Sequence, residues 1–198
     1  MTRRETVTYG VAAAVSLLAS AGCARAATKA ADQSECAWQQ LPSDQRTALL
    51  SAYSAQGSDG LGTVQISDST IRAVAQACKA KEMDSPHLRT VSVAMAGAAM
   101  RHGAEAGLAA RGVQVERLDT VWHTTSAQKS ALIESVRNPD RSPKGAKQLF
   151  GEVADLTRLA GGTVPAEQDA TSDPTFRLYA DYFIGRTLEE GASSSMRR

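Results

Sequence analysis

The sequence has no strong excess of charge of either sign, and no long apolar run outside its first residues. Its 198 residues include 22 Lys and Arg against 21 Asp and Glu, for a formal net charge of +1. Proteins that hold nucleic acid through its phosphates need a basic face, and no dense run of Lys or Arg occurs. After position 26 there is no stretch of about 18 consecutive apolar residues. We therefore expect no nucleic-acid partner and no transmembrane segment in the mature chain.

The short motifs that carry most recognisable chemistry are also missing. Gly57, Gly60 and Gly62 neither follow a predicted strand nor precede a Lys-Ser or Lys-Thr pair, so they do not form a phosphate-binding loop. Zinc-protease pairs, nucleophile elbows and Cys-x-x-Cys pairs are absent as well. We predict no cofactor and no metal centre. A binding module is favoured over an enzyme, because it needs only a shaped surface.

The first thirty residues have the order of features of a secretory signal. A pair of arginines near the start precedes a short apolar run at 11–21, and Ala24-Arg25-Ala26 offers small residues around a cleavage site. We predict a signal peptide over 1–26 and export of the mature protein to the periplasm or the extracellular space. Two alternatives stay open, namely the twin-arginine route and a lipid anchor on Cys23.

Cysteine is scarce, with three in the whole chain. If Cys23 belongs to the signal or carries a lipid, Cys36 and Cys78 remain in the mature protein. An even pair in an exported protein predicts one disulfide, which would join the leading segment to the helix that carries Cys78. The alternative is two separate buried thiols, since a metal site would need further ligands.

Helix start and stop signals recur along the chain, whereas alternating strand patterns are nearly absent. Six or seven helices joined by short loops predict a single all-α domain over 27–192, orthogonal or bundle-like, with a flexible tail at 193–198. The segments expected to be helical are 43–55, 67–78, 85–110, 115–122, 132–136, 142–160 and 173–192.

His102 has the best-placed neighbour of the three histidines. Glu105 follows three residues later on the same helical face, as an acid/base pair or a metal site would need. These two residues are the candidate catalytic groups of an alternative function, a small periplasmic enzyme or metal carrier. In the competing interpretation they are surface residues, with Glu105 paired to Arg101. Glu189 and Glu190 diverge by about 100° around a helix and are expected at a solvated helix end.

The helix at 85–110 is rich in Gly and Ala, and Gly103 with Gly107 makes a flat spot on one face. Glycine inside a helix costs roughly 1 kcal/mol relative to alanine, so a compensating interaction is expected. Close packing inside the fold is the leading interpretation. A homodimer contact or a ligand channel along this face is the alternative.

The last helix concentrates the aromatic residues on one face about 120° wide. That face either docks onto the core or forms the wall of a groove with two phenol hydroxyls. Together these features predict an exported helical protein that binds an envelope protein or a small apolar ligand. Its candidate ligand-binding residues are Phe176, Tyr179, Tyr182 and Phe183.

Overall fold

The computed structural model describes residues 33–80 and 83–196 of the chain. The expected signal peptide at 1–26 and the lipid anchor at Cys23 lie outside the described residues. Every regular element within them is helical, which confirms the predicted all-α class. The α-helices are α1 (Gln33–Gln40), α2 (Ser43–Gln56), α3 (Ser58–Leu61), α4 (Asp68–Ala77), α5 (Ser85–Ala109), α6 (Val115–Thr124), α7 (Ser126–Arg137), α8 (Pro143–Leu159) and α9 (Pro174–Met196), with a 3-10 turn at Glu167–Asp169.

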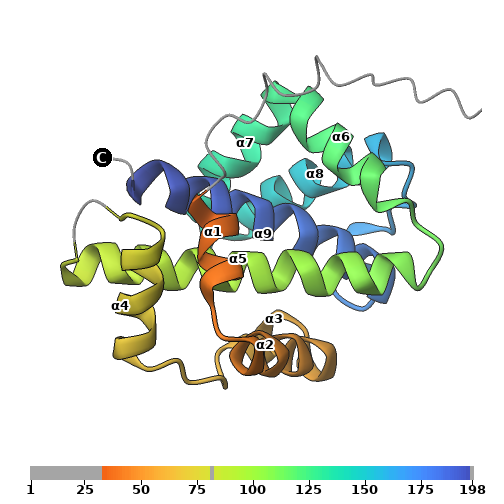
Figure 1. Ribbon diagram of the computed structural model, residues 1–198. Coiled ribbons are helices and arrows are strands. Elements are labelled where there is room, and N and C mark those ends of the chain that lie inside the picture. Colours follow the sequence, from red (N-terminus) through yellow and green to blue (C-terminus); the bar gives the residue numbers. More distant parts are fainter. Residues whose placement is uncertain (1–32, 81–82, 197–198) are drawn as a thin grey trace, which may run out of the picture.

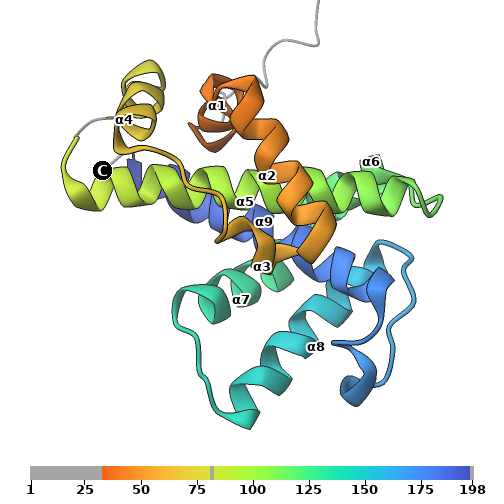
Figure 2. The same ribbon diagram turned by 90° about the horizontal axis from the view of Figure 1, so that it is seen from below.

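The long helices α5 and α9 run side by side through the centre of the molecule (Figure 1, Figure 2). Gly97 and Gly185 face each other where the two helices meet. A Cβ added to Gly97 would lie 2.8 Å from the carbonyl oxygen of Gly185, and one added to Gly185 would lie 2.7 Å from that of Gly97. No side chain fits between backbones this close, so close helix packing accounts for glycine at this point of α5.

The other helices cover the α5–α9 pair from different sides. In Figure 2, α1 and α4 lie on one side of the pair, α7 and α8 lie on the other, and α2 crosses in front of α5. One hydrophobic cluster is built mainly from α1, α2, α4 and the first half of α5. A second cluster combines the second half of α5 with α6, α7, α8 and α9. The two clusters therefore meet near the middle of α5.

Several helices begin where the sequence indicates. Ser67 and Ser142 each accept a hydrogen bond from the backbone N–H three residues later, as N-caps do. The expected segments at 43–55 and 85–110 also begin at the first residues of α2 and α5, but Ser43 and Ser85 are not the caps. Asp84 caps α5, and the residue before α2 is Pro42, which has no capping side chain.

Two expectations about the chain's organisation need correction. The described residues hold nine α-helices rather than six or seven, because α1 is too polar and α3 too short to show apolar periodicity. The expected flexible tail at 193–198 is helical as far as Met196, and Ser193 is only 1% exposed. This end of α9 packs into the first cluster through Ala192, which holds it in place.

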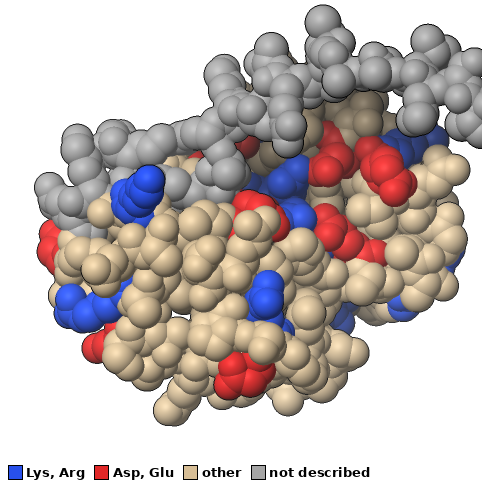
Figure 3. Space-filling model, in the orientation of Figure 1, with Lys and Arg blue, Asp and Glu red and all other residues tan. Residues whose placement is uncertain are grey.

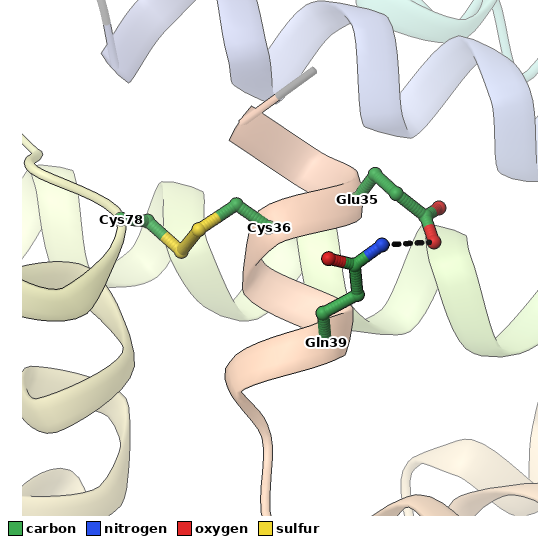
Figure 4. Close-up of a disulfide and its surroundings, with 4 residues drawn as sticks. All are labelled: Glu35, Cys36, Gln39 and Cys78. Carbon is green, nitrogen blue, oxygen red and sulfur yellow. Dashed lines mark hydrogen bonds between the residues drawn. A yellow bond between two sulfur atoms is a disulfide. The ribbon is translucent and has the colours of Figure 1, made fainter. Parts of the chain in front are cut away.

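The predicted disulfide between Cys36 and Cys78 is confirmed. It joins α1 to the residue that ends α4, across 42 positions of sequence. Figure 4 shows Cys36 and Glu35 pointing to different sides of α1, so the helix is bound to α4 on one side and offers a carboxylate on the other. Among the described helices, none combines the length and the apolar character that crossing a membrane requires.

Candidate functional site

A cluster of charged side chains surrounds Arg101 in the middle of α5; we call Glu35, Arg101, His102, Glu105 and Glu189 the Arg101 cluster. The guanidinium donates from Nη2 to Glu35 at 2.5 Å, from Nη1 to Glu105 at 3.0 Å and from Nε to Glu189 at 2.9 Å. Burial alone would lower the pKa of Arg101, but Glu189 and Glu105 raise it above its usual value. Arg101 therefore stays charged and ties α1 and α9 to α5.

Glu189 is the most deeply buried carboxylate of the cluster, at 2% exposure. Burial raises its pKa, and the positive charges of Arg101 and Arg186 oppose that rise. Its second oxygen, Oε1, has no hydrogen-bond partner among the described residues. The expectation of a solvated Glu189-Glu190 pair is wrong for Glu189, because α9 turns this side chain toward α5. Glu190 remains near the surface, 3.0 Å from Nζ of Lys129.

The structure brings His102 and Glu105 together, with Nδ1 3.1 Å from a carboxylate oxygen of Glu105. The other ring nitrogen of His102 lies 3.2 Å from Nη2 of Arg101, which can only donate. Nε2 is thus the acceptor and Nδ1–H donates to Glu105. Burial would raise the pKa of Glu105, but the hydrogen bonds from His102 and Arg101 hold it below its usual value. Both groups are already engaged in the Arg101 cluster.

His102 also carries the contact to the first helix. Its ring stacks on Trp38 of α1, with the ring centroids 5.1 Å apart. Within the described residues, no three His, Cys, Asp or Glu side chains are grouped in a way that could hold a metal ion. The site around His102 is therefore a network of hydrogen bonds, ion pairs and one aromatic stack.

A cleft of about 620 Å³ opens next to the Arg101 cluster, between α2, α5 and the first turns of α9. Its α5 wall is formed by His102 and by the small residues Gly103, Ala106 and Gly107. A Cβ on Gly103 would lie 2.2 Å from the ring of Tyr53, so that ring rests directly on the α5 backbone. Leu178 packs on Gly107 in the same way, so the two glycines predicted to make a flat spot allow close packing of α2 and α9 on α5, beside the cleft.

Polar groups of the cleft come from α2 and α9. The hydroxyl of Tyr53 donates to Oδ2 of Asp181 at 2.7 Å. Burial raises the pKa of Tyr53, and the neighbouring Asp181 carboxylate raises it further. Burial also raises the pKa of Asp181, against the opposing influence of the Tyr53 hydrogen bond and of Arg177. Arg177 and Arg111 line the cleft as well.

The aromatic candidates on α9 do not line the cleft. All four lie in the second hydrophobic cluster, between 0% and 4% exposed, so the core-docking interpretation applies to them. The adjacent face of α9 supplies the cleft with Arg177, Leu178 and Asp181 instead. The spacing of Arg177 and Asp181 by four residues was the available sequence signal, because it places two charged groups on one face. The candidate aromatic residues are Phe176, Tyr179, Tyr182 and Phe183.

Charges of both signs are intermixed on the face of the molecule that Figure 3 shows. In the view of Figure 3, Lys and Arg side chains of the described residues lie among Asp and Glu side chains rather than gathering in one patch. This distribution matches the formal net charge of +1. Charge could therefore select a ligand only locally, within a site such as the cleft.

Comparison of the chain with protein-family models, with curated proteins and with solved structures gives no match. The function is therefore inferred from the geometry of the cleft and of the Arg101 cluster.

Proposed function

We propose that this protein binds a small ligand with an apolar body in the cleft between α2, α5 and α9. The observation that carries the proposal is a hollow of about 620 Å³ lined by residues of α2, α5 and the first turns of α9. Sites for small molecules are typically clefts of about 300–1,000 Å³ with apolar walls and a few placed polar groups. Leu50 and Leu178 supply apolar walls, and the Tyr53–Asp181 pair is one such polar feature.

In this proposal His102 has a positioning role. It lines the cleft while its ring nitrogens are bonded to Glu105 and Arg101 and its face is stacked on Trp38. These three contacts fix the orientation of the His102 ring, which is part of the cleft wall. The Arg101 cluster therefore helps to maintain the shape of the cleft.

A fluorescent apolar probe tests the proposal. N-phenyl-1-naphthylamine is expected to bind with saturable enhancement and a stoichiometry of one. Ala106→Trp places a large ring in the cleft from an exposed position of α5 and should abolish binding. The matched control is Ala131→Trp, at an exposed position of α7 away from the cleft, which should bind the probe as the unmodified chain does. Equal binding by both variants, or no saturable binding at all, would contradict the proposal.

We also propose that the protein is exported. The Cys36–Cys78 disulfide supports this, because disulfides form and persist mainly in oxidising compartments outside the cytosol. The intact mass of the protein from its own host provides the test. A chain that starts at Ala27 supports cleavage after Ala26, and one that starts at an acylated Cys23 identifies a lipoprotein. A full-length chain with both cysteines reduced would contradict export.

A further inference from the structure

Building on the proposed ligand cleft, we infer that its ligand is an amphipathic monoanion, an apolar chain or ring system with one carboxylate that Arg177 and Arg111 bind. Both arginines line the cleft, one from the second turn of α9 and one from just beyond the end of α5. Guanidinium groups match the planar, two-oxygen geometry of a carboxylate. The cleft thus has two cationic side chains as well as apolar walls.

Arg177 is placed by the backbone of the α2–α3 junction. Gly57 has a φ of +65°, a conformation that favours glycine, and a Cβ at this position would lie 3.2 Å from Nη2 of Arg177. The guanidinium of Arg177 therefore lies across the junction beside the cleft. This close approach limits the directions in which the arginine can point.

Arg111 is held against the last turn of α5. Its Nη1 donates to the carbonyl oxygen of Gly107 at 2.8 Å, and Gly107 itself lines the cleft. Across the described residues, neither Arg111 nor Arg177 forms an ion pair with a carboxylate, in contrast to Arg101 and Arg186. Both guanidiniums therefore keep donors that a ligand carboxylate can use.

Asp181, the carboxylate that lines the cleft, is already satisfied by protein groups. Its Oδ2 accepts from the Tyr53 hydroxyl at 2.7 Å, and Ser58 also donates a hydrogen bond to it. Asp59 lies close enough to influence Asp181 but is exposed and does not line the cleft. Two arginines against one engaged carboxylate leave the cleft with an excess of positive charge.

The apolar part of such a ligand has a matching surface next to these two arginines. Leu178 lies one residue after Arg177 and packs over Gly107, where a Cβ would come within 2.9 Å of its methyl groups. Leu50 and Ala106 extend the apolar surface within the same cleft. A carboxylate at the arginines would therefore place an attached chain along Leu178 and Ala106.

Competition between a matched acid and alcohol tests the inference. Decanoate and 1-decanol have the same chain and differ in the head group, and each is titrated against bound N-phenyl-1-naphthylamine at pH 7. We expect decanoate to displace the probe at a concentration at least about tenfold lower than 1-decanol. In the double variant Arg111→Gln/Arg177→Gln, the concentration of decanoate that displaces the probe should rise to that of 1-decanol, because the two guanidiniums inferred to bind the carboxylate are gone. The affinity of this variant for the probe is titrated first, so that displacement is compared at equal probe occupancy.

The control variant is Arg141→Gln/Arg158→Gln, which removes the same two charges at exposed positions outside the cleft. It should keep the preference for decanoate, which excludes an effect of net charge alone. Equal displacement by the acid and the alcohol, displacement by neither, or a preference that persists in the Arg111/Arg177 variant would overturn the inference. In those cases the proposed function would still hold if the unmodified chain binds the probe and Ala106→Trp abolishes that binding. Failure of the unmodified chain to bind the probe would instead contradict the proposed function.

Discussion

Arg101 and Glu189 form a buried ion pair between residues 88 positions apart in the chain, with Nε 2.9 Å from Oε2. Their side chains are 9% and 2% exposed. Arg101 lies at the point of α5 where the two hydrophobic clusters meet, directly after Met100 of one and two residues after Ala99 of the other. Because Glu35 binds the same guanidinium, this one side chain connects α1, α5 and α9 at the centre of the fold.

Replacing Arg101 with methionine should strongly destabilise the protein. The change leaves the buried carboxylate of Glu189 without its cation, and breaking a buried pair in this way typically costs about 3–5 kcal/mol. The free energy of unfolding in urea measures the effect. Arg158→Met is the matched control, since Arg158 and Asp155 form a pair whose side chains are 59% and 61% exposed. Such exposed pairs contribute about 0–1 kcal/mol, so similar losses in the two variants would contradict the central role of Arg101.

Glu189→Gln should change how stability depends on pH. Burial raises the pKa of Glu189 above its ordinary 4.5, so the folded chain holds this proton more tightly than the unfolded chain. The contribution of Glu189 to stability is therefore greatest below pH 4.5 and decreases as pH rises through the raised pKa. Glutamine does not ionise, so the variant should gain stability relative to the unmodified chain as pH rises above 4.5.

Urea unfolding at several pH values between 4 and 7 measures this difference. The lowered pKa of Glu105 acts in the opposite direction in both proteins, and the subtraction removes much of it. Glu190→Gln is the matched control, because it removes the neighbouring carboxylate of α9, which pairs with Lys129 near the surface rather than with Arg101. A difference curve for Glu189→Gln that stays flat would show that Glu189 titrates as it does in the unfolded chain.

The all-α class could be predicted because helix starts are local signals, and the disulfide because two cysteines remain after the expected signal peptide. Ser67, Ser142 and the proline at position 143 act on the first turn of their own helices, and Cys36 and Cys78 are an even pair. α1 could not be predicted, because its eight residues are mostly polar and show no apolar periodicity, although Trp38 within it is buried.

The candidate site was harder to predict because it depends on distant contacts. The helical spacing placed His102 and Glu105 on one face, but their partners Glu35 and Glu189 come from other helices. Glu189 lies seven residues after the buried Tyr182, so helical spacing places both on one face of α9, but the partner Arg101 comes from α5. The aromatic residues of α9 lie on the face that packs in the core, whereas the neighbouring face, which includes Arg177, lines the cleft.

Adding one methyl group at Gly97 should destabilise the contact between α5 and α9. In Gly97→Ala, the new Cβ would lie 2.8 Å from the carbonyl oxygen of Gly185 and 2.9 Å from Cβ of Leu188, so the helices must move apart. Overpacking of this kind costs about 1–3 kcal/mol. Gly151→Ala is the control, because Gly151 lies inside α8 with no atom within 4 Å of its added Cβ.

The control substitution should stabilise the protein by about 0.5–1 kcal/mol, because alanine favours a helix interior over glycine. Thermal or urea unfolding of the two variants should therefore show changes of opposite sign. If Gly97→Ala also stabilised the protein, the close packing of α5 and α9 would be contradicted. If Gly151→Ala destabilised it, the helix-propensity argument would be contradicted. The pair of substitutions separates these two contributions within one fold.

Breaking the disulfide should release α1 from the rest of the structure. For a separation of 42 residues, the chain-entropy estimate of the stabilisation is about 4 kcal/mol, which Cys36→Ser/Cys78→Ser should lose. Trp38 reports the release, because it is 6% exposed, stacks on His102 and lies two residues after Cys36. In a Trp122→Phe background Trp38 is the remaining tryptophan of the chain, and its emission should shift to longer wavelength when reductant is added.

The same reductant added to the double serine variant, also in the Trp122→Phe background, is the control and should leave its emission unchanged. An emission shift of equal size in that control would assign the effect to the reductant itself. If reduction leaves both the emission and the unfolding free energy of the disulfide form unchanged, the Glu35–Arg101 pair and the Trp38–His102 stack hold α1 on their own. A shift confined to the disulfide form would show that the bridge keeps Trp38 stacked on His102, the ring that forms one wall of the cleft.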